Sequence, residues 1–420
     1  LSPAEEETVA EVCVLTDHPV AAHEWKDERR PLGVTDGLDV RIRDKLAVLR
    51  ETAYNNTDLG FHKYFLTLYN NDMIDYVKRK RFIHSIIYKN YIMNREETMD
   101  WIDMHCDTLS ELIKGKEETL QENGLCVDIK RLKQAKAAAQ FFACYVNIAE
   151  FAGNESMWDR AYERVLSMTD YARGSEGKEF RLAYTVDDIL SAKEEKKTAG
   201  ILTVEEGGVL NGRAERLREL YGRGVRLITL TWNHSNCIGS PNSRDPKVMK
   251  RGLTGFGLEI VEQMNGMGII VDVSHLSDGG FYDCIRQSKA PVVASHSNAR
   301  ALCAHPRNLT DEMLRILGEK GGVAGVNFYS PFLREGGGAD IFDVARHAAY
   351  MIDRAGEDAV ALGADLDGFG KTDLPRGIRG VQDMERLWAA FEKAGITPRQ
   401  IEKIAHKNVM RILREVTTAQ

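Results

Sequence analysis

The chain has 420 residues, 43% of them hydrophobic, and a formal net charge of −7. This length suits one large domain or two to three average ones, and the apolar content is ample for a core. The acidic balance argues against nucleic-acid binding, which needs a basic surface. No apolar run reaches the roughly 18 residues that a membrane span requires, so we expect no membrane association.

The seven cysteines are scattered along the chain, and none forms a C-x-x-C pair. An odd number of cysteines without regular spacing is typical of reduced thiols rather than of a disulfide framework. The first residues, LSPAEEETVAEV, are acidic and lack the basic and apolar regions of a secretory signal. We therefore expect a cytoplasmic protein.

Residues 1–98 differ in character from the rest of the chain. Their second half is rich in Tyr, Asn, Ile and Lys and has neither a clear hydrophobic period nor turn residues, and its basic cluster at 78–81 is interpreted as a solvated charge run. The chain starts on Leu1, whereas Met93 and Met99 lie just ahead of the first expected strand. We expect residues 1–98 to be an N-terminal extension of undefined structure. Our hypothesis is that it originates upstream of the true start codon and is not part of the native protein, leaving 99–420 as the barrel domain.

From residue 101 onward, apolar segments bounded by turns alternate with amphipathic helical patterns. The eight apolar segments are 101–107, 139–148, 199–208, 225–233, 268–275, 291–297, 322–330 and 359–368. Near-continuously apolar strands that alternate with helices predict parallel pairing with both faces covered. Eight such units predict a (β/α)8 TIM barrel, followed by a final helix with Thr397 as its N-cap. A doubly wound open sheet is the alternative.

The first of these segments, within WIDMHCDTLS at 101–110, ends on His105, Cys106 and Asp107. Side chains alternate along a strand, so His105 and Asp107 are expected to converge on one point, where a metal ion could bind. For this motif alone, a hydrogen-bonded turn is the alternative. Cys106 is expected to face the opposite way, which argues against a role as nucleophile.

The C-terminal ends of the strands form the active-site end of a TIM barrel. The candidate residues that this rule places there are His105, Asp107, Glu205, Glu206, His234, His275, His296, Asp365 and Asp367. Imidazoles with carboxylates are typical ligands of Zn²⁺, and carboxylates can hold a second ion by bridging. Two ions could hold a hydroxide between them, so the pattern predicts hydrolysis of an amide. No G-x-S-x-G motif offers a competing serine nucleophile.

Several motifs occur in the order and at roughly the spacing of one known family. They are DMHCDT, VEEGG, LTWNHSN, VDVSH, SHSNAR, HPRN, GVNFY and GADLDG. Over about residues 99–416 the chain resembles the membrane (renal) dipeptidase family of the amidohydrolase superfamily. The resemblance implies a zinc-dependent dipeptidase on a TIM barrel with two Zn²⁺ ions per chain and a hydroxide between them.

The resemblance also implies the metal ligands. His105 and Asp107 resemble the ligands of the first ion, and Glu206 resembles the bridging carboxylate. His275 and His296 resemble the ligands of the second ion. Glu205, adjacent to Glu206, is expected to face the opposite side of its strand and to form a salt bridge.

Further roles follow from the same resemblance. Asp365 resembles the aspartate that carries the proton to the leaving amine, with Asp367 as the alternative. Arg307 resembles the arginine that receives the substrate's C-terminal carboxylate, for which a planar guanidinium is well shaped. His234 is the candidate for contacting and polarising the scissile carbonyl. The chain departs from the better-known members at two places: Val209 replaces a histidine after Glu-Gly-Gly, and two residues intervene between Leu-Thr and His234.

Two other functions remain open at this point. The chain could hydrolyse another small amide, such as an N-acyl amino acid or a cyclic amide, or it could be a non-catalytic binding protein on the same barrel. Arg307 favours substrates with a free carboxylate. A homodimer is expected as the commonest assembly of such proteins.

Overall fold

The computed structural model describes residues 100–115, 119–153 and 155–417. The predicted extension, residues 1–98, lies outside this part of the chain. Within it, the parallel strands are β1 (Trp101–Asp103), β2 (Ala137–Tyr145), β3 (Phe180–Leu182), β4 (Thr198–Glu205), β5 (Val225–Thr229), β6 (Ile270–Asp272), β7 (Val293–Ala294), β8 (Val323–Val326) and β9 (Val360–Leu362).

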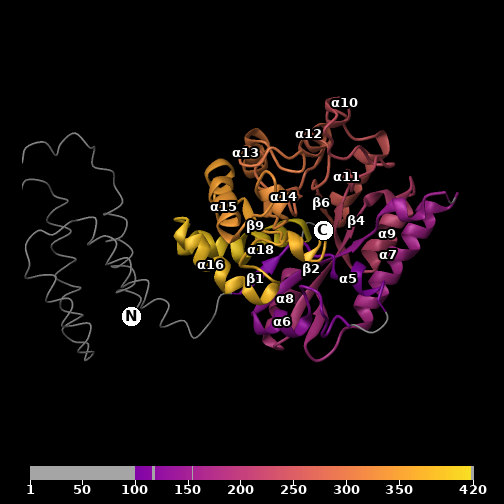
Figure 1. The fold of residues 1–420 in the computed structure, drawn as a ribbon. Helices are drawn as coiled ribbons and strands as arrows, with labels where there is room; N and C mark the ends of the chain where they lie inside the picture. Colours follow the sequence, from indigo (N-terminus) through magenta and orange to yellow (C-terminus); the bar gives the residue numbers. More distant parts are fainter. Residues whose placement is uncertain (1–99, 116–118, 154, 418–420) are drawn as a thin grey trace, which may run out of the picture. The chain divides into compact units, whose positions relative to one another are not determined.

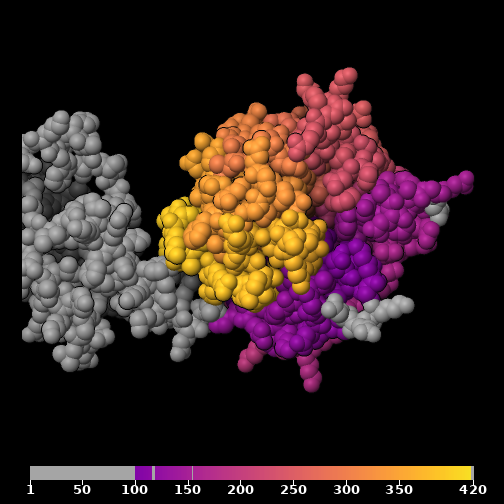
Figure 2. Space-filling view, viewed as in Figure 1, coloured from indigo at the N-terminus to yellow at the C-terminus, as the bar shows by residue number. Residues whose placement is uncertain are grey.

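The strands form a closed barrel. The order β2-β1-β9-β8-β7-β6-β5-β4 is closed by β2 pairing with β4, from Ala139 opposite Ala199 to Tyr145 opposite Glu205. The predicted TIM barrel is thereby confirmed, and the doubly wound open sheet is excluded. Figure 2 shows the result on the surface, where segments from the start of the barrel (indigo) adjoin segments from its end (yellow).

β3 is a strand that the sequence did not predict. It has three residues and pairs with the first residues of β4, Phe180 opposite Thr198, so it lies beside the closed barrel. Each of the eight predicted segments overlaps one of the eight barrel strands, although β2 and β4 begin two residues and one residue before their segments.

Helices surround the strands (Figure 1). Their bounds are α5 (Thr108–Leu112), α6 (Ile129–Gln134), α7 (Met157–Gly174), α8 (Val186–Glu194), α9 (Ala214–Gly222), α10 (Pro246–Met249), α11 (Gly255–Met267), α12 (Asp278–Gln287), α13 (Asp311–Glu319), α14 (Ser330–Leu333), α15 (Ile341–Ala355), α16 (Met384–Lys393), α17 (Pro398–Glu402) and α18 (Asn408–Thr417). Thr397 caps α17 as predicted, because its hydroxyl accepts from the backbone N–H of Gln400 while the Gln400 side chain accepts from that of Thr397. No helix in the described ranges is long and apolar enough to span a bilayer.

The N-terminal end of the barrel is filled by apolar side chains. Ile102, Leu227 and Ile270, from the early parts of their strands, share one buried cluster with Ile412 and Val416 of α18. This packing covers the N-terminal strand ends, so the C-terminal ends are the ones left for polar side chains.

The strands stop earlier at their C-terminal ends than the apolar segments suggested. β6 ends at Asp272 and β9 at Leu362, a few residues before the histidine and aspartates that follow. There the chain leaves the extended conformation, with positive φ at Glu206 (96°), His275 (65°) and Asp365 (61°). Side-chain alternation therefore does not apply beyond the strand ends.

Candidate metal centre

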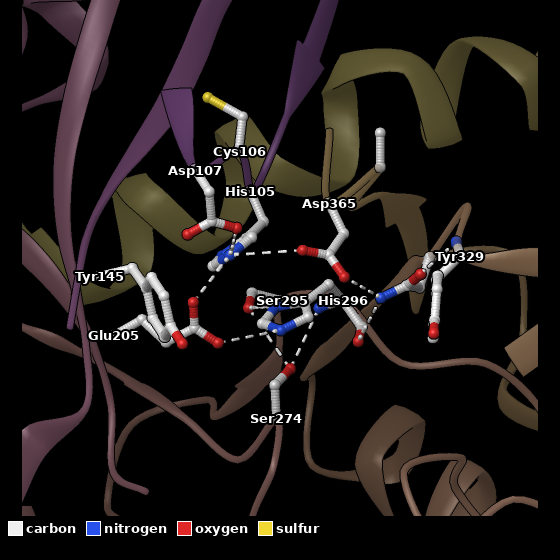
Figure 3. Close-up of polar contacts among 12 residues, drawn as sticks. His105, Cys106, Asp107, Tyr145, Glu205, Ser274, Ser295, His296, Tyr329 and Asp365 are labelled. Carbon is white, nitrogen blue, oxygen red and sulfur yellow. Dashed lines mark hydrogen bonds and ion pairs between the residues drawn. The ribbon is translucent and has the colours of Figure 1, made fainter. Parts of the chain in front are cut away.

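His105 is buried and lies among three carboxylates, of which those of Asp107 and Glu205 are buried and that of Asp365 is partly exposed (Figure 3). Its Nε2 atom is 3.3 Å from Asp107 Oδ2, 3.2 Å from Glu205 Oε2 and 3.8 Å from Asp365 Oδ1. Three buried atoms at this site form no hydrogen bond: the Nδ1 and Nε2 atoms of His105 and the Oδ1 atom of Asp107. Buried polar atoms without partners are rare in folded proteins and call for a ligand or ion.

Glu205 occupies the centre of the site. Its second oxygen, Oε1, lies 3.0 Å from His275 Nε2 and 3.5 Å from His296 Nε2. One carboxylate thus faces three imidazoles, which lie just after the ends of β1, β6 and β7. Glu205 is the last residue of β4, and it projects from the same face of the strand as Ile201 and Thr203, toward the barrel interior.

Glu206 does not take this place, which corrects the prediction that it is the bridging carboxylate. At φ 96° its backbone turns out of the strand, and its carboxylate accepts hydrogen bonds from Gly208 N (2.9 Å), Asn236 Nδ2 (2.5 Å) and Trp232 N (3.4 Å). Burial raises the pKa of Glu206 to about 7. Glu206 therefore holds the loop after β5 rather than the histidines.

The electrostatics of the cluster favour a cation at its centre. Burial would lower the pKa of His105, but the carboxylates of Glu205 and Asp107 raise it well above its ordinary value. Burial also opposes ionisation of Glu205, yet the neighbouring imidazoles hold its pKa well below the usual range. Both shifts show that positive charge is stabilised between these residues.

His275 and His296 offer neutral nitrogen ligands. Burial, reinforced by Arg307, lowers the pKa of His275 to about 4, and burial lowers that of His296 well below its ordinary value. Their Nε2 atoms lie 3.0 Å apart, both beside Glu205. Neutral imidazole is the form of histidine that binds a metal.

Two groups of side chains fit a divalent ion. His105, Glu205 and His296 form one and His105, Asp107 and Asp365 the other, with the ligand atoms in each within 4.8 Å of one another. Nitrogen and carboxylate oxygen donors suit Zn²⁺ and its neighbours in the first transition series. The donor set and the partnerless atoms of His105 and Asp107 are thus consistent with a metal centre.

Asp365 and Asp367 have separate surroundings. Asp365 points into the cluster, where Asn327 Nδ2 donates to its Oδ2 atom (2.8 Å) and burial raises its pKa to about 7. Asp367 has φ 69° and instead accepts from Thr108 Oγ1 (2.7 Å) and Cys126 N (2.7 Å). The two aspartates therefore point to different surroundings although they are two residues apart, because neither lies in a strand.

Arg307 is buried beside the histidines. Its two Nη atoms donate to Ser297 Oγ (3.2 Å) and to the carbonyl of His296 (3.0 Å), whereas its Nε atom has no hydrogen-bond partner. Burial lowers its pKa to about 10, so it is charged at neutral pH. Arg307 and His275 line one small pocket, where a partnerless guanidinium N–H can receive an anion.

Two further predicted residues lie outside the cluster. His234 is exposed, and its ring lies 6.2 Å from that of Trp232, measured between centroids. Cys106 points away from His105 and Asp107, as expected, and packs in the core (Figure 3). Asn327 was missed, although it directly follows β8 and the rule of strand ends would have included it.

Comparison with known proteins places the chain among metallopeptidases. An uncharacterized dipeptidase of Schizosaccharomyces pombe is 33% identical over 310 residues, which are 70% of this chain and 73% of that protein. Dipeptidase tcpJ of Claviceps purpurea is 32% identical over 303 residues, 69% of each chain.

Solved structures agree. The crystal structure of dipeptidase AC, a metallopeptidase of family M19, has a TM-score of 0.69 and 30% identity, covering 77% of this chain and all of that one. A metallopeptidase of Rhodobacter sphaeroides, liganded with a phosphinate mimic of L-Ala-D-Ala, has a TM-score of 0.68 and 29% identity, covering 76% and 100%. The model of the membrane dipeptidase family (peptidase family M19) matches residues 92–420, and the chain belongs to that family.

Proposed function

We propose that the chain hydrolyses the peptide bond of dipeptides with a hydroxide held between two divalent metal ions. The observation that carries this proposal is the carboxylate of Glu205, whose oxygens lie 3.2 Å from His105 Nε2 and 3.0 Å from His275 Nε2. A single buried carboxylate between ligand sets on opposite sides is the arrangement that two neighbouring ions require. Family membership and the dipeptide mimic bound by the Rhodobacter relative support the choice of substrate.

His105 and Asp107 would hold one ion, His275 and His296 the other, and Glu205 would bridge them. When bound, the ions would lower the pKa of water between them and polarise the scissile carbonyl. Zinc is the proposed metal, since N/O sites bind it more tightly than manganese or iron. Free thiols at the described cysteines suit the reducing cytoplasm, which is the proposed compartment, and the homodimer stays a prediction.

Asp365 is proposed to move the proton. Its Oδ1 atom faces His105 while its Oδ2 atom is held by Asn327, so the carboxyl group has a fixed orientation at the edge of the cluster. Burial raises its pKa to about 7, which suits a group that accepts and returns a proton near neutral pH. It would deliver this proton to the amine that leaves.

Arg307 is proposed to bind the C-terminal carboxylate of the dipeptide. Its guanidinium is fixed by Ser297 and by the His296 carbonyl, which leaves its Nε–H free. A carboxylate bound there would set the distance from the substrate's C-terminus to the cleaved bond, so substrates longer than dipeptides would be excluded at this end. His234 stays a prediction as the carbonyl-polarising group.

The test is hydrolysis by the zinc-loaded full chain of a dipeptide, its C-terminal amide, an N-acyl amino acid and a cyclic dipeptide. We expect cleavage of the dipeptide, a much higher KM for the amide, and no turnover after chelation or in Glu205→Gln. Equal turnover of the cyclic dipeptide would refute the proposed substrate class.

A further inference from the structure

We infer that Asp272 and Ser295 are positioning residues that fix which nitrogen of His296 carries its proton, and so keep the Nε2 lone pair available to a metal ion. The inference rests on the metal centre in the proposed function. It assigns a role to a buried carboxylate that contacts neither the proposed ions nor the substrate.

Asp272 is the last residue of β6 and is fully buried. Its Oδ1 atom accepts from the backbone N–H groups of Ser274 (2.9 Å) and Ser295 (2.8 Å). Its Oδ2 atom accepts from the hydroxyls of Thr229 (2.6 Å) and Ser295 (2.6 Å). The four donors leave the carboxylate in a fixed orientation, as an acceptor only.

Ser295 connects this carboxylate to the histidine. Its Oγ atom is 2.6 Å from Asp272 Oδ2 and 2.7 Å from His296 Nδ1, and Figure 3 shows it beside the imidazole. A hydroxyl has one proton to donate, and the ionised carboxylate is the stronger acceptor. The Ser295 hydroxyl therefore donates to Asp272 and must accept from His296.

The direction of these bonds determines the tautomer. To donate to Ser295, His296 must carry its proton on Nδ1, and the lone pair is then on Nε2. That atom lies 3.0 Å from His275 Nε2 and 3.5 Å from Glu205 Oε1, at the proposed position of the second ion. Outer partners of this kind commonly orient metal-binding histidines.

Asp272→Asn is the decisive variant, because asparagine has nearly the same shape as aspartate but would reverse the direction of the hydrogen bonds from His296 through Ser295 to residue 272. The two backbone N–H groups hold the amide oxygen at the Oδ1 position, so the amide N–H₂ would point at Ser295 Oγ. Ser295 would then accept from the amide and donate to His296 Nδ1. The proton of the imidazole would move to Nε2, where it blocks the metal.

Ser295→Ala and Ser297→Ala complete the series. Ser295→Ala removes the partner of Nδ1 and leaves both tautomers accessible, so its effect should be smaller. Ser297 belongs to the same group of serines, with Oγ 3.4 Å from Ser274 Oγ, but it contacts Arg307 and not the imidazole. Ser297→Ala is the matched control, because it removes a neighbouring serine hydroxyl that does not contact His296.

The experiment titrates Zn²⁺ into the chelator-treated full chain in competition with an indicator. We expect the affinity for the weaker ion to fall about 10- to 100-fold in Asp272→Asn and less in Ser295→Ala, with no change in Ser297→Ala. Wild-type affinity in a folded Asp272→Asn variant, or a larger loss in Ser295→Ala, would overturn the inference. If Asp272→Asn does not fold, equal affinities of Ser295→Ala and Ser297→Ala would overturn it.

A second measurement needs no substitution of Asp272 or Ser295. In the ¹⁵N-histidine spectrum of the metal-free full chain, assigned with His296→Gln, the proton of His296 should be on Nδ1. A proton on Nε2 would refute the inference. Neither readout depends on dipeptide hydrolysis, so a chain that binds zinc without cleaving dipeptides would refute the proposed function and leave this inference standing.

Discussion

Gly368 provides a strong test of the metal centre, because a side chain at this residue would collide with the carboxylates of Asp107 and Asp365. An ideal Cβ built there lies 2.4 Å from Asp365 Oδ1 and 2.5 Å from Asp107 Oδ2, whereas ordinary contacts begin at 3.4 Å. In Gly368→Ala each oxygen would have to withdraw by about 1 Å, although metal–ligand distances tolerate only about 0.2 Å. We expect the variant to lose the ion held by His105 and Asp107 together with its turnover.

The fold should survive this change. Overpacking by one methyl group costs about 1–3 kcal/mol, and Gly368 does not have the left-handed φ that would add backbone strain. Gly370→Ala is the matched control, because its Cβ would meet nothing closer than Thr372 Oγ1 at 3.6 Å. Metal analysis, zinc titration and thermal unfolding of both variants measure the difference. Wild-type zinc content and turnover in Gly368→Ala would refute the placement of the first ion.

Four further outcomes follow from the site. Glu205→Gln should weaken binding of both ions. Glu206→Gln should keep the zinc content but lower the free energy of unfolding by about 1–3 kcal/mol, because an amide nitrogen in place of one carboxyl oxygen leaves a buried donor without an acceptor; zinc loss in Glu206→Gln alone would contradict this. Arg307→Met should raise KM for dipeptides by the equivalent of about 1.5–3 kcal/mol with kcat little changed, and an unchanged KM would move the carboxylate site elsewhere. Asp365→Asn should lower kcat about 10²–10⁴-fold while metal content stays near that of the wild type; loss of one ion would instead make Asp365 a ligand. His234→Asn should lower kcat less than Asp365→Asn does, since His234 is exposed; an equal loss measured in steady-state assays would show that the loop brings it to the substrate.

The barrel was predictable because its strands are buried on both faces. Such strands are near-continuous apolar segments, and the helices between them have a different period, so the alternation is visible in one sequence. β3 was not predictable in this way, since it has three residues, includes the charged Arg181, and is stabilised by pairing with the start of β4. Short strands of this kind depend on tertiary contacts more than on local pattern.

The bridging role was given to Glu206 from the family resemblance, and the burial of both faces of β4 left no alternation of polar and apolar residues that would have favoured Glu205. When both faces of β4 are apolar, the sequence does not tell which residues point into the barrel. Thr203, a polar residue in the otherwise apolar interior of this strand, could have indicated the face that points into the barrel. Glu205 is two residues further on and therefore lies on the same face as Thr203. His105 was a candidate from its place after a strand, although the motif alone left a hydrogen-bonded turn open.

Backbone conformation at the strand ends accounts for the remaining differences and also for the site. Left-handed φ at a residue other than glycine costs about 1–3 kcal/mol and persists where the surroundings impose it. His275, at φ 65°, is held by its carbonyl, which accepts from Asn242 N (2.7 Å) and Asn242 Nδ2 (3.0 Å), and Asp365, at φ 61°, by its N–H, which donates to the His105 carbonyl (3.2 Å). These contacts join segments far apart in the sequence, so no local pattern reveals them. These contacts give the side chains of His275 and Asp365 a direction that alternation along a strand would not predict. Both side chains then point to the position where three imidazoles and Glu205 meet.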